Sequence, residues 1–363
     1  MNFKIPAFTP PDFANDFPTN APDVTLEAVK EDGLSPLNYH ALSIFPEYFK
    51  INGKWILAVQ SRMDTVCVAN DTPGEESVNI VEFRNLKKGD KVVIGRTEDG
   101  SEGIYVYTKG FKAAGGNDDT FAFRAGRSRE TAFSMDYDNL SDLLKYEKSH
   151  NGYVTWVLGS AISLDRSSRA ALEQLVRGGF VQAIFCGTAT AAFDLECGIY
   201  DSSWGQKEFY AEGNTNDNYY KTINLARKYG SLQALTESGV VKDGFVKACI
   251  ECGVDLVIAG TIRDRFTLPG TYDNVYEAQN AMRKHTRKTT SIIMVSAVLF
   301  TIATGNMTPS YNEFDGVIRP IYMYTVDIQE FTVNKLSDRG TLTAVSIVTN
   351  GQDFMTNIGQ ALS

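Results

Sequence analysis

The strongest constraint on the fold is a regular alternation of short apolar runs and helical patterns after residue 151. The apolar runs occupy residues 154–158, 181–185, 254–258, 292–295, 321–326 and 344–348. The helical patterns between and after them include residues 168–177, 219–228, 275–285 and 331–337. Strands that alternate with helices form a mostly parallel sheet that is covered on both faces. We therefore predict an α/β fold that binds its ligands at the carboxyl ends of the strands.

The preceding part of the chain has a different pattern. Between about residues 37 and 123, short β-rich runs are separated by turn signals such as Asn52-Gly53 and Asp99-Gly100. This pattern favours an antiparallel barrel or sandwich. A chain of 363 residues has room for two domains. The predicted organisation is an N-terminal extension (1–36), a small β-rich domain (37–125), a linker helix (126–150) and the α/β domain (151–363).

The charge and the apolar runs exclude several classes of partner. The formal net charge is −9 and there is no long run of lysine or arginine, so no nucleic-acid or anionic-membrane partner is expected. The N-terminus lacks a basic segment followed by an apolar stretch, and the apolar run at residues 291–303 is too short to span a bilayer. We expect a soluble protein whose partner is a small molecule.

Cysteine usage indicates the compartment. The five cysteines are an odd number scattered through apolar contexts, which suits a reducing compartment, and we expect the cytoplasm. Cys249 and Cys252 form a single C-x-x-C, but one pair cannot complete a tetrahedral zinc site and no second pair lies nearby. They are interpreted as buried thiols of a helix, and no metal site is predicted.

Loops of small residues follow the first two predicted strands of the α/β part. They are Gly159-Ser160-Ala161 and Gly187-Thr188-Ala189. If the two strands are neighbours, these loops lie side by side and their amides could approach a pyrophosphate. Neither loop matches G-x-G-x-x-G, so tight strand-to-helix turns explain them equally well.

Later strands supply further candidates for a nucleotide site. The third apolar run leads to Gly260 and Thr261, and the fourth leads to Gly305 and Asn306, in what we expect to be polar loops. Asp327 follows the fifth run. An acidic residue at a strand end can accept both hydroxyls of a ribose, as in NAD sites. Capping of the following helix explains Asp327 equally well.

An ordered set of motifs resembles a known family. The set comprises Gly159-Ser160-Ala161, Gly187-Thr188-Ala189 with Asp194-Leu195-Glu196, Ala259-Gly260-Thr261-Ile262-Arg263-Asp264, Gly305-Asn306-Met307-Thr308-Pro309 and Val326-Asp327-Ile328. Over most of residues 37–354 the chain resembles the lysine-oxoglutarate reductase/saccharopine dehydrogenase-associated family, which includes archaeal-type ornithine cyclodeaminases. The resemblance implies a small β-domain followed by a Rossmann-like domain related to deoxyhypusine synthase. It also implies that NAD is bound tightly and recycled.

The resemblance implies a reaction, and the chain departs from what that reaction requires. An ornithine cyclodeaminase passes a hydride from Cα to NAD, expels ammonia after the side-chain amine attacks, and returns the hydride to give proline. Members usually carry histidines in several loops as proton relays. This chain has other residues there, namely Phe45, Leu164, Phe193, Asn216, Tyr219 and Phe300. These residues predict a drier, more aromatic pocket with an altered substrate, so the chain is interpreted as a divergent member.

Three residues are the candidate catalytic groups. Asp264, just beyond a strand end, could shuttle protons to a leaving amine, and Arg263 could clamp a substrate carboxylate. An ion pair that only holds the loop is equally consistent. Asp194 could contact a ribose or the substrate amine, but a helix-capping role explains it at least as well.

Other charged residues are interpreted as structural. Arg62 and Asp64 match the family but are expected at an interdomain or subunit contact rather than in catalysis. The basic cluster at residues 124–129 is interpreted as a solvated linker. His285 lies near the end of a predicted helix, where its charge would complement the helix dipole.

We therefore expect a cyclodeaminase-like, NAD-dependent enzyme that acts on an amino acid or amine by hydride transfer at the amine-bearing carbon. A non-catalytic or regulatory NAD-binding protein and a simple NAD-dependent amino-acid dehydrogenase are the alternatives. A homo-oligomer is also expected, with the β-rich domain of one chain near the NAD domain of another, because symmetric homo-oligomers are common among soluble enzymes.

Overall fold

The computed structural model describes residues 3–14, 21–111, 134–202, 217–261, 264, 266–339 and 341–363. Two small antiparallel sheets form its first part. The four-stranded sheet runs in the order β1 (Thr25–Ala28), β6 (Lys91–Ile94), β4 (Thr65–Asn70) and β5 (Ser77–Glu82). The three-stranded sheet runs in the order β3 (Lys54–Leu57), β2 (Glu47–Ile51) and β7 (Ile104–Val106). A short 3-10 helix, η1 (Phe83–Asn85), follows β5.

Local sequence signals explain this β-rich part. The Asn52-Gly53 turn joins β2 to β3, and both residues have positive φ, 48° and 79°, which asparagine and glycine adopt most easily. Buried side chains of both sheets, including Phe49 and Ile104, share one apolar core. Strand β1 lies within residues 1–36 and pairs with β6. The domain boundaries given above stay a prediction.

The second part is built around a six-stranded parallel sheet. Its strands are β8 (Val154–Leu158), β9 (Ala183–Gly187), β10 (Asp255–Ala259), β11 (Ser291–Val295), β14 (Tyr322–Asp327) and β15 (Ala344–Val348). They lie in the order β10-β9-β8-β11-β14-β15. If the six strands are numbered 1 to 6 along the chain, their order across the sheet is 3-2-1-4-5-6. This is the strand order of dinucleotide-binding Rossmann folds. The predicted fold class, a Rossmann-like parallel sheet preceded by a β-rich part, is confirmed.

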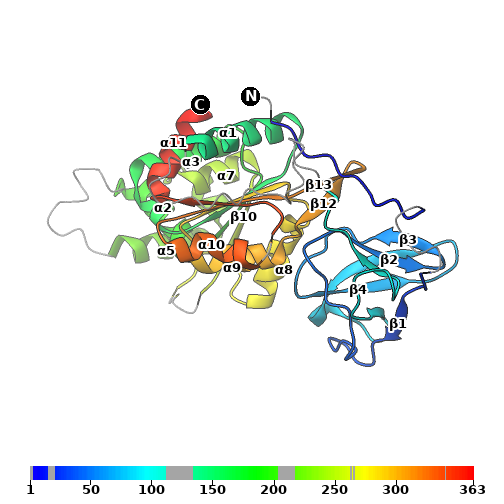
Figure 1. Ribbon diagram of the computed structural model, residues 1–363. Coiled ribbons are helices and arrows are strands. Elements are labelled where there is room, and N and C mark those ends of the chain that lie inside the picture. The colour runs from blue at the N-terminus through cyan, green and yellow to red at the C-terminus, as the bar shows by residue number, and fades with distance from the viewer. Residues whose placement is uncertain are drawn as a thin grey trace.

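Helices cover both faces of this sheet (Figure 1). One face carries α1 (Ser134–Ser149), α3 (Arg166–Arg177), α7 (Phe245–Cys252) and α11 (Gly351–Ala361). The other carries α8 (Val275–Thr286), α9 (Val298–Met307) and α10 (Glu330–Arg339). The remaining helices are α2 (Ala161–Leu164), α4 (Thr188–Tyr200), α5 (Asp217–Tyr229) and α6 (Leu232–Glu237). Each face has its own apolar core, with Trp156 and Phe354 on the first side and Met282 and Met307 on the second.

Two local predictions are wrong. Gly305 and Asn306 were expected in a loop after the fourth strand of the sheet, but both lie in the last turn of α9. The second error is a missed hairpin, β12 (Tyr311–Phe314) and β13 (Val317–Pro320). Its turn contains Asp315 and Gly316, both at positive φ, 49° and 79°. This Asp-Gly pair is a hairpin signal that the sequence contains.

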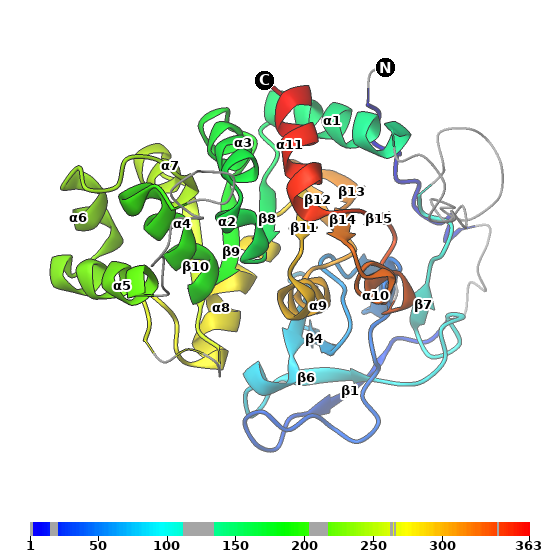
Figure 2. The ribbon, with the colours of Figure 1, turned by 90° about the vertical axis from the view of Figure 1, so that its left-hand side faces the viewer.

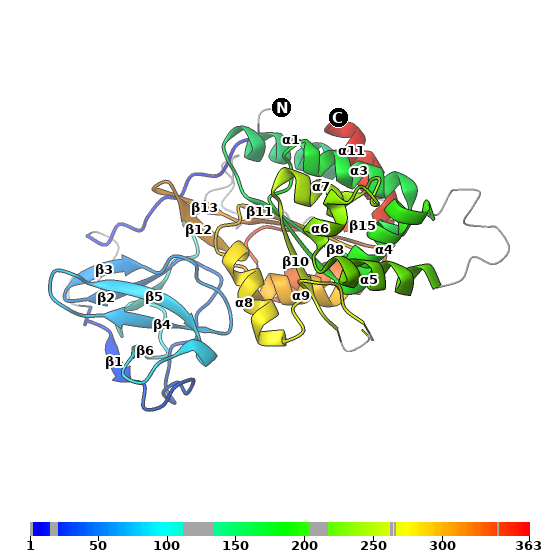
Figure 3. The ribbon, with the colours of Figure 1, turned by 180° about the vertical axis from the view of Figure 1, so that it is seen from behind.

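The β-rich part lies beside α8 and the β12–β13 hairpin (Figures 1 and 3). Glu82 at the end of β5 is the centre of this contact, since it binds Arg62 from its own part and Arg283 and Arg287 from the region of α8. Tyr311 donates a hydrogen bond of 2.5 Å to the carbonyl oxygen of Ala58 across the same boundary. In Figure 1, α2 and α5 lie at the opposite end of the molecule. Among the described residues, no helix combines the length and apolar character needed to cross a membrane.

Candidate functional site

The parallel strands end at one edge of the sheet, which Figure 2 views head-on. The strand order reverses between β8 and β11, and ligands of such sheets bind in the crevice at this switch point. Here a backbone hydrogen bond joins the ends of β8 and β11. Gly159 donates a hydrogen bond of 2.9 Å to the Val295 carbonyl oxygen. A Cβ atom on Gly159 would lie 1.7 Å from the Ser296 carbonyl oxygen, so only glycine fits this position.

The helices that begin at the central strands lack side-chain caps. Helices α2, α4 and α9 follow β8, β9 and β11, and their N-cap residues Ser160, Gly187 and Ala297 make no capping hydrogen bond through a side chain. In contrast, side chains cap helices α3, α6, α8 and α11, namely Asp165, Ser231, Asn274 and Asn350. In α4 and α9 the first amides are left without a side-chain cap, and together with the helix dipole they attract anions. In the four-residue α2, Ile162 and Ser163 already donate to the carbonyl oxygens of Gly159 and Ser160.

Thr188 adds to the polar character of this crevice. It is the first residue of α4 and is fully buried, and its hydroxyl has no hydrogen-bond partner among the described residues. Gly187, just before it, has an ordinary φ of −83°. The nearest atoms to a Cβ built on Gly187 belong to Phe300 and Thr261, at 3.6 and 3.9 Å. The ends of β8, β9 and β10 and the first turn of α9 therefore surround one space, as the sequence predicts for the first two loops.

Asp327 lies at the same edge, as the last residue of β14. Its Oδ1 accepts a hydrogen bond of 2.9 Å from the backbone amide of Gln329, just before α10. This hydrogen bond fits the alternative interpretation of Asp327, in which its side chain caps the start of the next helix. Gly260 and Thr261 follow β10, and Gly260 donates a hydrogen bond of 2.8 Å to the Tyr272 carbonyl oxygen.

Gly305 and Asn306 lie away from this edge. A Cβ on Gly305 would meet the Leu336 side chain at 2.2 Å, so this glycine lets α9 pack closely against α10. Asn306 lines a cavity of about 300 Å³ together with Arg62, Asp64 and Glu82 of the β-rich part. The structure does not bring these two residues together with the other cofactor candidates, because they end α9 rather than begin it.

Asp264 folds back on its own loop. Its Oδ2 accepts a hydrogen bond of 2.8 Å from the Thr261 amide, and its amide donates one of 3.0 Å to the Thr261 carbonyl oxygen. Tyr219 of α5 faces Asp264. Burial raises the pKa of Tyr219 to about 12, and the charges of Asp264 and Glu196 and nearby Tyr220 add to the shift. The other catalytic candidate of this loop, Arg263, lies outside the described residues, as does the basic cluster at 124–129.

Asp194 is in the core rather than in the crevice. Its side chain is fully buried and accepts a hydrogen bond of 2.8 Å from Arg169 Nε. The first amides of α7, those of Phe245 and Val246, also donate to its two carboxylate oxygens at 3.3 and 2.9 Å. Burial lowers the pKa of Arg169, but Asp194 and Asp243 more than offset this effect and the net shift is upward. The structure contradicts the predicted catalytic role, because Asp194 caps α7 and neutralises a buried arginine.

A group of four aromatic side chains, called here the aromatic cluster, borders Asp264. It consists of Phe193, Tyr219, Tyr220 and Phe266. Successive ring centroids are 4.9, 5.4 and 6.1 Å apart. The sequence flagged Phe193 and Tyr219 as departures from the family, but not Tyr220 and Phe266, which join the cluster only through the packing of separate segments.

Glu196 was also missed as a candidate. It lies three residues after Phe193 on α4, a spacing that places both on one helix face. Burial raises the pKa of Glu196 to about 6, and a hydrogen bond from Ser202 only partly opposes this. Two carboxylates, Glu196 and Asp264, therefore flank Tyr219 from α4 and from the β10 loop.

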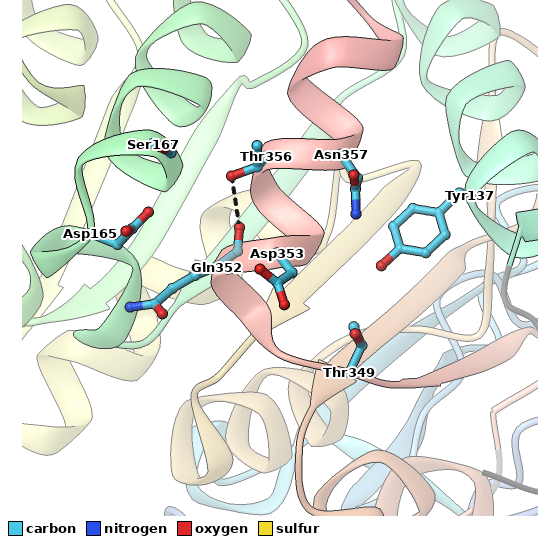
Figure 4. Close-up of a pocket in the computed structure, with 8 residues that line it drawn as sticks. All are labelled: Tyr137, Asp165, Ser167, Thr349, Gln352, Asp353, Thr356 and Asn357. Carbon is cyan, nitrogen blue, oxygen red and sulfur yellow. Dashed lines mark hydrogen bonds between the residues drawn. The ribbon is translucent and has the colours of Figure 1, made fainter. Parts of the chain in front are cut away.

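A polar cavity of about 620 Å³ lies between α1, α3 and α11 (Figure 4). Its walls are Tyr137, Asp165, Ser167, Thr349, Gln352, Asp353, Thr356 and Asn357. Several of these groups already serve the fold. Asp165 accepts from the Ser168 amide at 2.7 Å, and Gln352 donates to the Ala161 carbonyl oxygen at 2.9 Å. Part of the polar lining of this cavity is therefore used by hydrogen bonds of the fold itself.

The described residues contain no group of three or more His, Cys, Asp or Glu side chains that could hold a metal ion. The structure describes all five cysteines, and none of them forms a disulfide. Cys249 is buried as predicted, but Cys252 is exposed, because the last turn of α7 turns it toward solvent. His285 lies within 2.7 Å of the Tyr153 hydroxyl, and burial lowers its pKa.

Comparison with known proteins gives a consistent set of relatives. The family described as arginine dihydrolase ArgZ-like, C-terminal, Rossmann fold matches residues 138–358. The bifunctional arginine dihydrolase/ornithine cyclodeaminase AgrE of Nostoc sp. is 30% identical over 352 residues, which are 96% of this chain and 48% of that protein. The ornithine cyclodeaminase of Methanocaldococcus jannaschii is 30% identical over 341 residues, 92% of this chain and 76% of the relative. The chain thus spans about half the length of AgrE.

Solved structures agree with these matches. A conserved LOR/SDH protein from Methanococcus maripaludis S2 superposes with a TM-score of 0.81 at 29% identity, covering 94% of this chain and 98% of that one. The ternary complex of AgrE with ornithine and NAD+ superposes with a TM-score of 0.58 at 29% identity, covering 96% of this chain and 46% of AgrE. Both likenesses therefore extend over the β-rich part as well as the α/β part.

Proposed function

The chain belongs to the arginine dihydrolase ArgZ-like family through its C-terminal Rossmann fold, and from this we propose that it is an NAD-dependent, cyclodeaminase-like enzyme acting on an amino acid or amine. Two relatives support the proposal by their activities, since they are named as ornithine cyclodeaminases. AgrE also binds ornithine and NAD+ together. The single observation that carries the proposal is the pair of uncapped helix starts, those of α4 and α9, at the carboxyl edge of the sheet.

The crevice residues fit a dinucleotide. The amides at the starts of α4 and α9 would face the pyrophosphate, and Gly159 and Gly187 keep the loops free of side chains. Ser160, Ala161, Ala189, Gly260 and Thr261 line the neighbouring turns. Asp327 would accept the ribose hydroxyls with the carboxylate oxygen that Gln329 does not occupy. Gly305 and Asn306 have no part in this site as proposed.

When bound, NAD would supply the acceptor for a hydride from the amine-bearing carbon. The chain would move protons through Asp264, which lies at the end of β10 beside Tyr219. Arg263, from the same loop, would orient a substrate carboxylate. The Arg263→Ala variant would then raise the substrate concentration needed for half-maximal rate more than it lowers the maximal rate.

We propose further that the substrate is not ornithine. Leu164, Phe193 and Phe300 are apolar where the family usually has histidines, and Phe300 borders the crevice beside Gly187. A diamine would lose the hydration of two charges without gaining polar partners from these residues, which is costly. Conversion of ornithine to proline and ammonia is therefore expected to be weak or absent.

Calorimetric titration with NAD tests the cofactor site. The wild-type chain should bind NAD, and Gly187→Val should weaken binding by roughly tenfold or more, because the side chain enters the space of the pyrophosphate. Gly187 has an ordinary φ, and a Cβ there would make ordinary van der Waals contacts of 3.6–3.9 Å with Phe300 and Thr261, so this variant should fold and melt like the wild type. A wild-type chain without affinity for NAD, or a folded variant with unchanged affinity, would contradict the proposal.

We also propose a homo-oligomer, which would bring the β-rich part of a second chain toward the open edge of the sheet. Within one chain the β-rich part lies at the far end of the molecule from α2 and α5. Crevices of this kind are usually closed against water during hydride transfer. Light scattering at micromolar concentration should report at least a dimer, and a monomer there would refute this proposal.

A further inference from the structure

We infer that the aromatic cluster and the two carboxylates beside it form the subsite for the ammonium group of the substrate. We infer also that this substrate is an amine with one cationic group on an apolar body. The inference rests on the function proposed above and names the substrate class for the same edge of the sheet. Two of its rings, Phe193 and Tyr219, stand where the family usually has histidines, whereas Glu196 and Asp264 belong to motifs that the chain shares with the family.

The rings present a continuous wall. Phe193 of α4 contacts Tyr219 of α5, Tyr219 contacts Tyr220, and Tyr220 contacts Phe266 of the β10 loop. Tyr220 and Phe266 are 38% and 48% exposed. These rings therefore keep part of their surface open to a ligand, unlike core aromatics. The face of an aromatic ring attracts a cation, and such walls recognise ammonium groups.

Two carboxylates, Glu196 and Asp264, make the surface of the aromatic cluster favour a positively charged ligand. Glu196 lies three residues after Phe193 on one face of α4. Asp264 lies two residues before Phe266 in the β10 loop, so both carboxylates are next to rings of the aromatic cluster. The charges of both also act on Tyr219.

Neither carboxylate has an ion-pair partner among the described residues. Their hydrogen-bond donors are uncharged, the Thr261 amide for Asp264 and the Ser202 hydroxyl for Glu196. A substrate ammonium would add a positive charge beside both carboxylates.

The apolar neighbours limit the substrate to one charge. Phe300 lies next to Gly187 at the end of β9, and Leu164 ends the short helix α2 that follows β8. A second ammonium placed against these side chains would lose its hydration without a partner. A hydrocarbon body would instead gain from burial there.

Calorimetry on the NAD-saturated protein tests the inference with three probes of similar length. Pentylammonium should bind roughly tenfold more tightly than neutral 1-pentanol, which has the same body without the charge. Ornithine, with two ammonium groups, should bind more weakly than pentylammonium. Equal affinity for pentylammonium and 1-pentanol, or tighter binding of ornithine, would overturn the inference.

Matched variants locate the subsite. Tyr220→Leu and Glu196→Gln should each weaken pentylammonium binding roughly tenfold while the affinity for NAD stays unchanged. Tyr229→Leu is the control, because Tyr229 ends the same helix α5 and is also 38% exposed. It should bind pentylammonium as the wild type does. Equal pentylammonium affinity of all three variants, in a protein that still binds NAD, would refute the subsite. Failure of the chain to bind NAD would instead refute the proposed function.

Discussion

Replacing Asp264 with asparagine should slow turnover by on the order of a hundredfold or more, the usual scale of general acid–base catalysis, while NAD affinity stays unchanged. The structural reason is that an asparagine side chain keeps an oxygen that can accept the 2.8 Å hydrogen bond from the Thr261 amide. The loop should therefore keep its shape. The amide cannot accept and return a proton, so only proton transfer is removed.

The measurement is the rate of NADH appearance in single turnovers with an amine that the wild type oxidises. Asp273→Asn is the matched control, because Asp273 is an exposed acid in the same connection between β10 and α8. It should react at the wild-type rate. Equal rates for the wild type and Asp264→Asn would remove Asp264 from the mechanism and leave it as a loop residue.

Asp194→Ala should lower the free energy of unfolding by about 3–5 kcal/mol, the usual cost of breaking one side of a buried ion pair. The variant leaves Arg169 buried beside α4 without its main carboxylate partner. It also removes the acceptor for the first two amides of α7. A catalytic aspartate would behave differently, because its loss would slow turnover without much change in stability.

Urea unfolding followed by circular dichroism measures this loss. Asp243→Ala is the control, since Asp243 pairs with the same Arg169 at 2.6 Å but its side chain is 54% exposed. Its loss should cost no more than about 1 kcal/mol, as for other exposed ion pairs. A stable Asp194→Ala variant with impaired turnover would restore the catalytic role that the buried position contradicts.

The fold could be predicted because its signals are local. Six apolar runs separated by helical patterns specify a parallel sheet, and the Asn52-Gly53 pair specifies a hairpin. The ordered motifs also pointed to archaeal ornithine cyclodeaminases and a LOR/SDH protein, which are among the relatives found, whereas the divergence from the family stays a prediction. The order of strands in the sheet needed the structure, because it depends on which crossovers form.

Candidate site residues could be predicted only where they follow directly from a strand end. Gly159 and Gly187 became candidates because a glycine after an apolar run is visible in the sequence, and their cofactor role stays a prediction. Asp194 was misassigned because its partner Arg169 lies 25 residues away and only packing brings them together. Gly305 was misassigned for a similar reason, since its role depends on Leu336 of another helix. The aromatic cluster likewise needs three segments to meet.

The uncapped starts of α4 and α9 have a consequence for the lifetime of the protein in a cell. Helix ends without caps fray more readily, and a side-chain cap typically contributes about 1 kcal/mol. On the proposed assignment, a bound dinucleotide satisfies these amides in the folded chain only. Mass action then adds about 2.7 kcal/mol of stability when free NAD is a hundred times its dissociation constant. Proteolysis should therefore remove the empty protein faster than the loaded one, so that its abundance follows the supply of its cofactor.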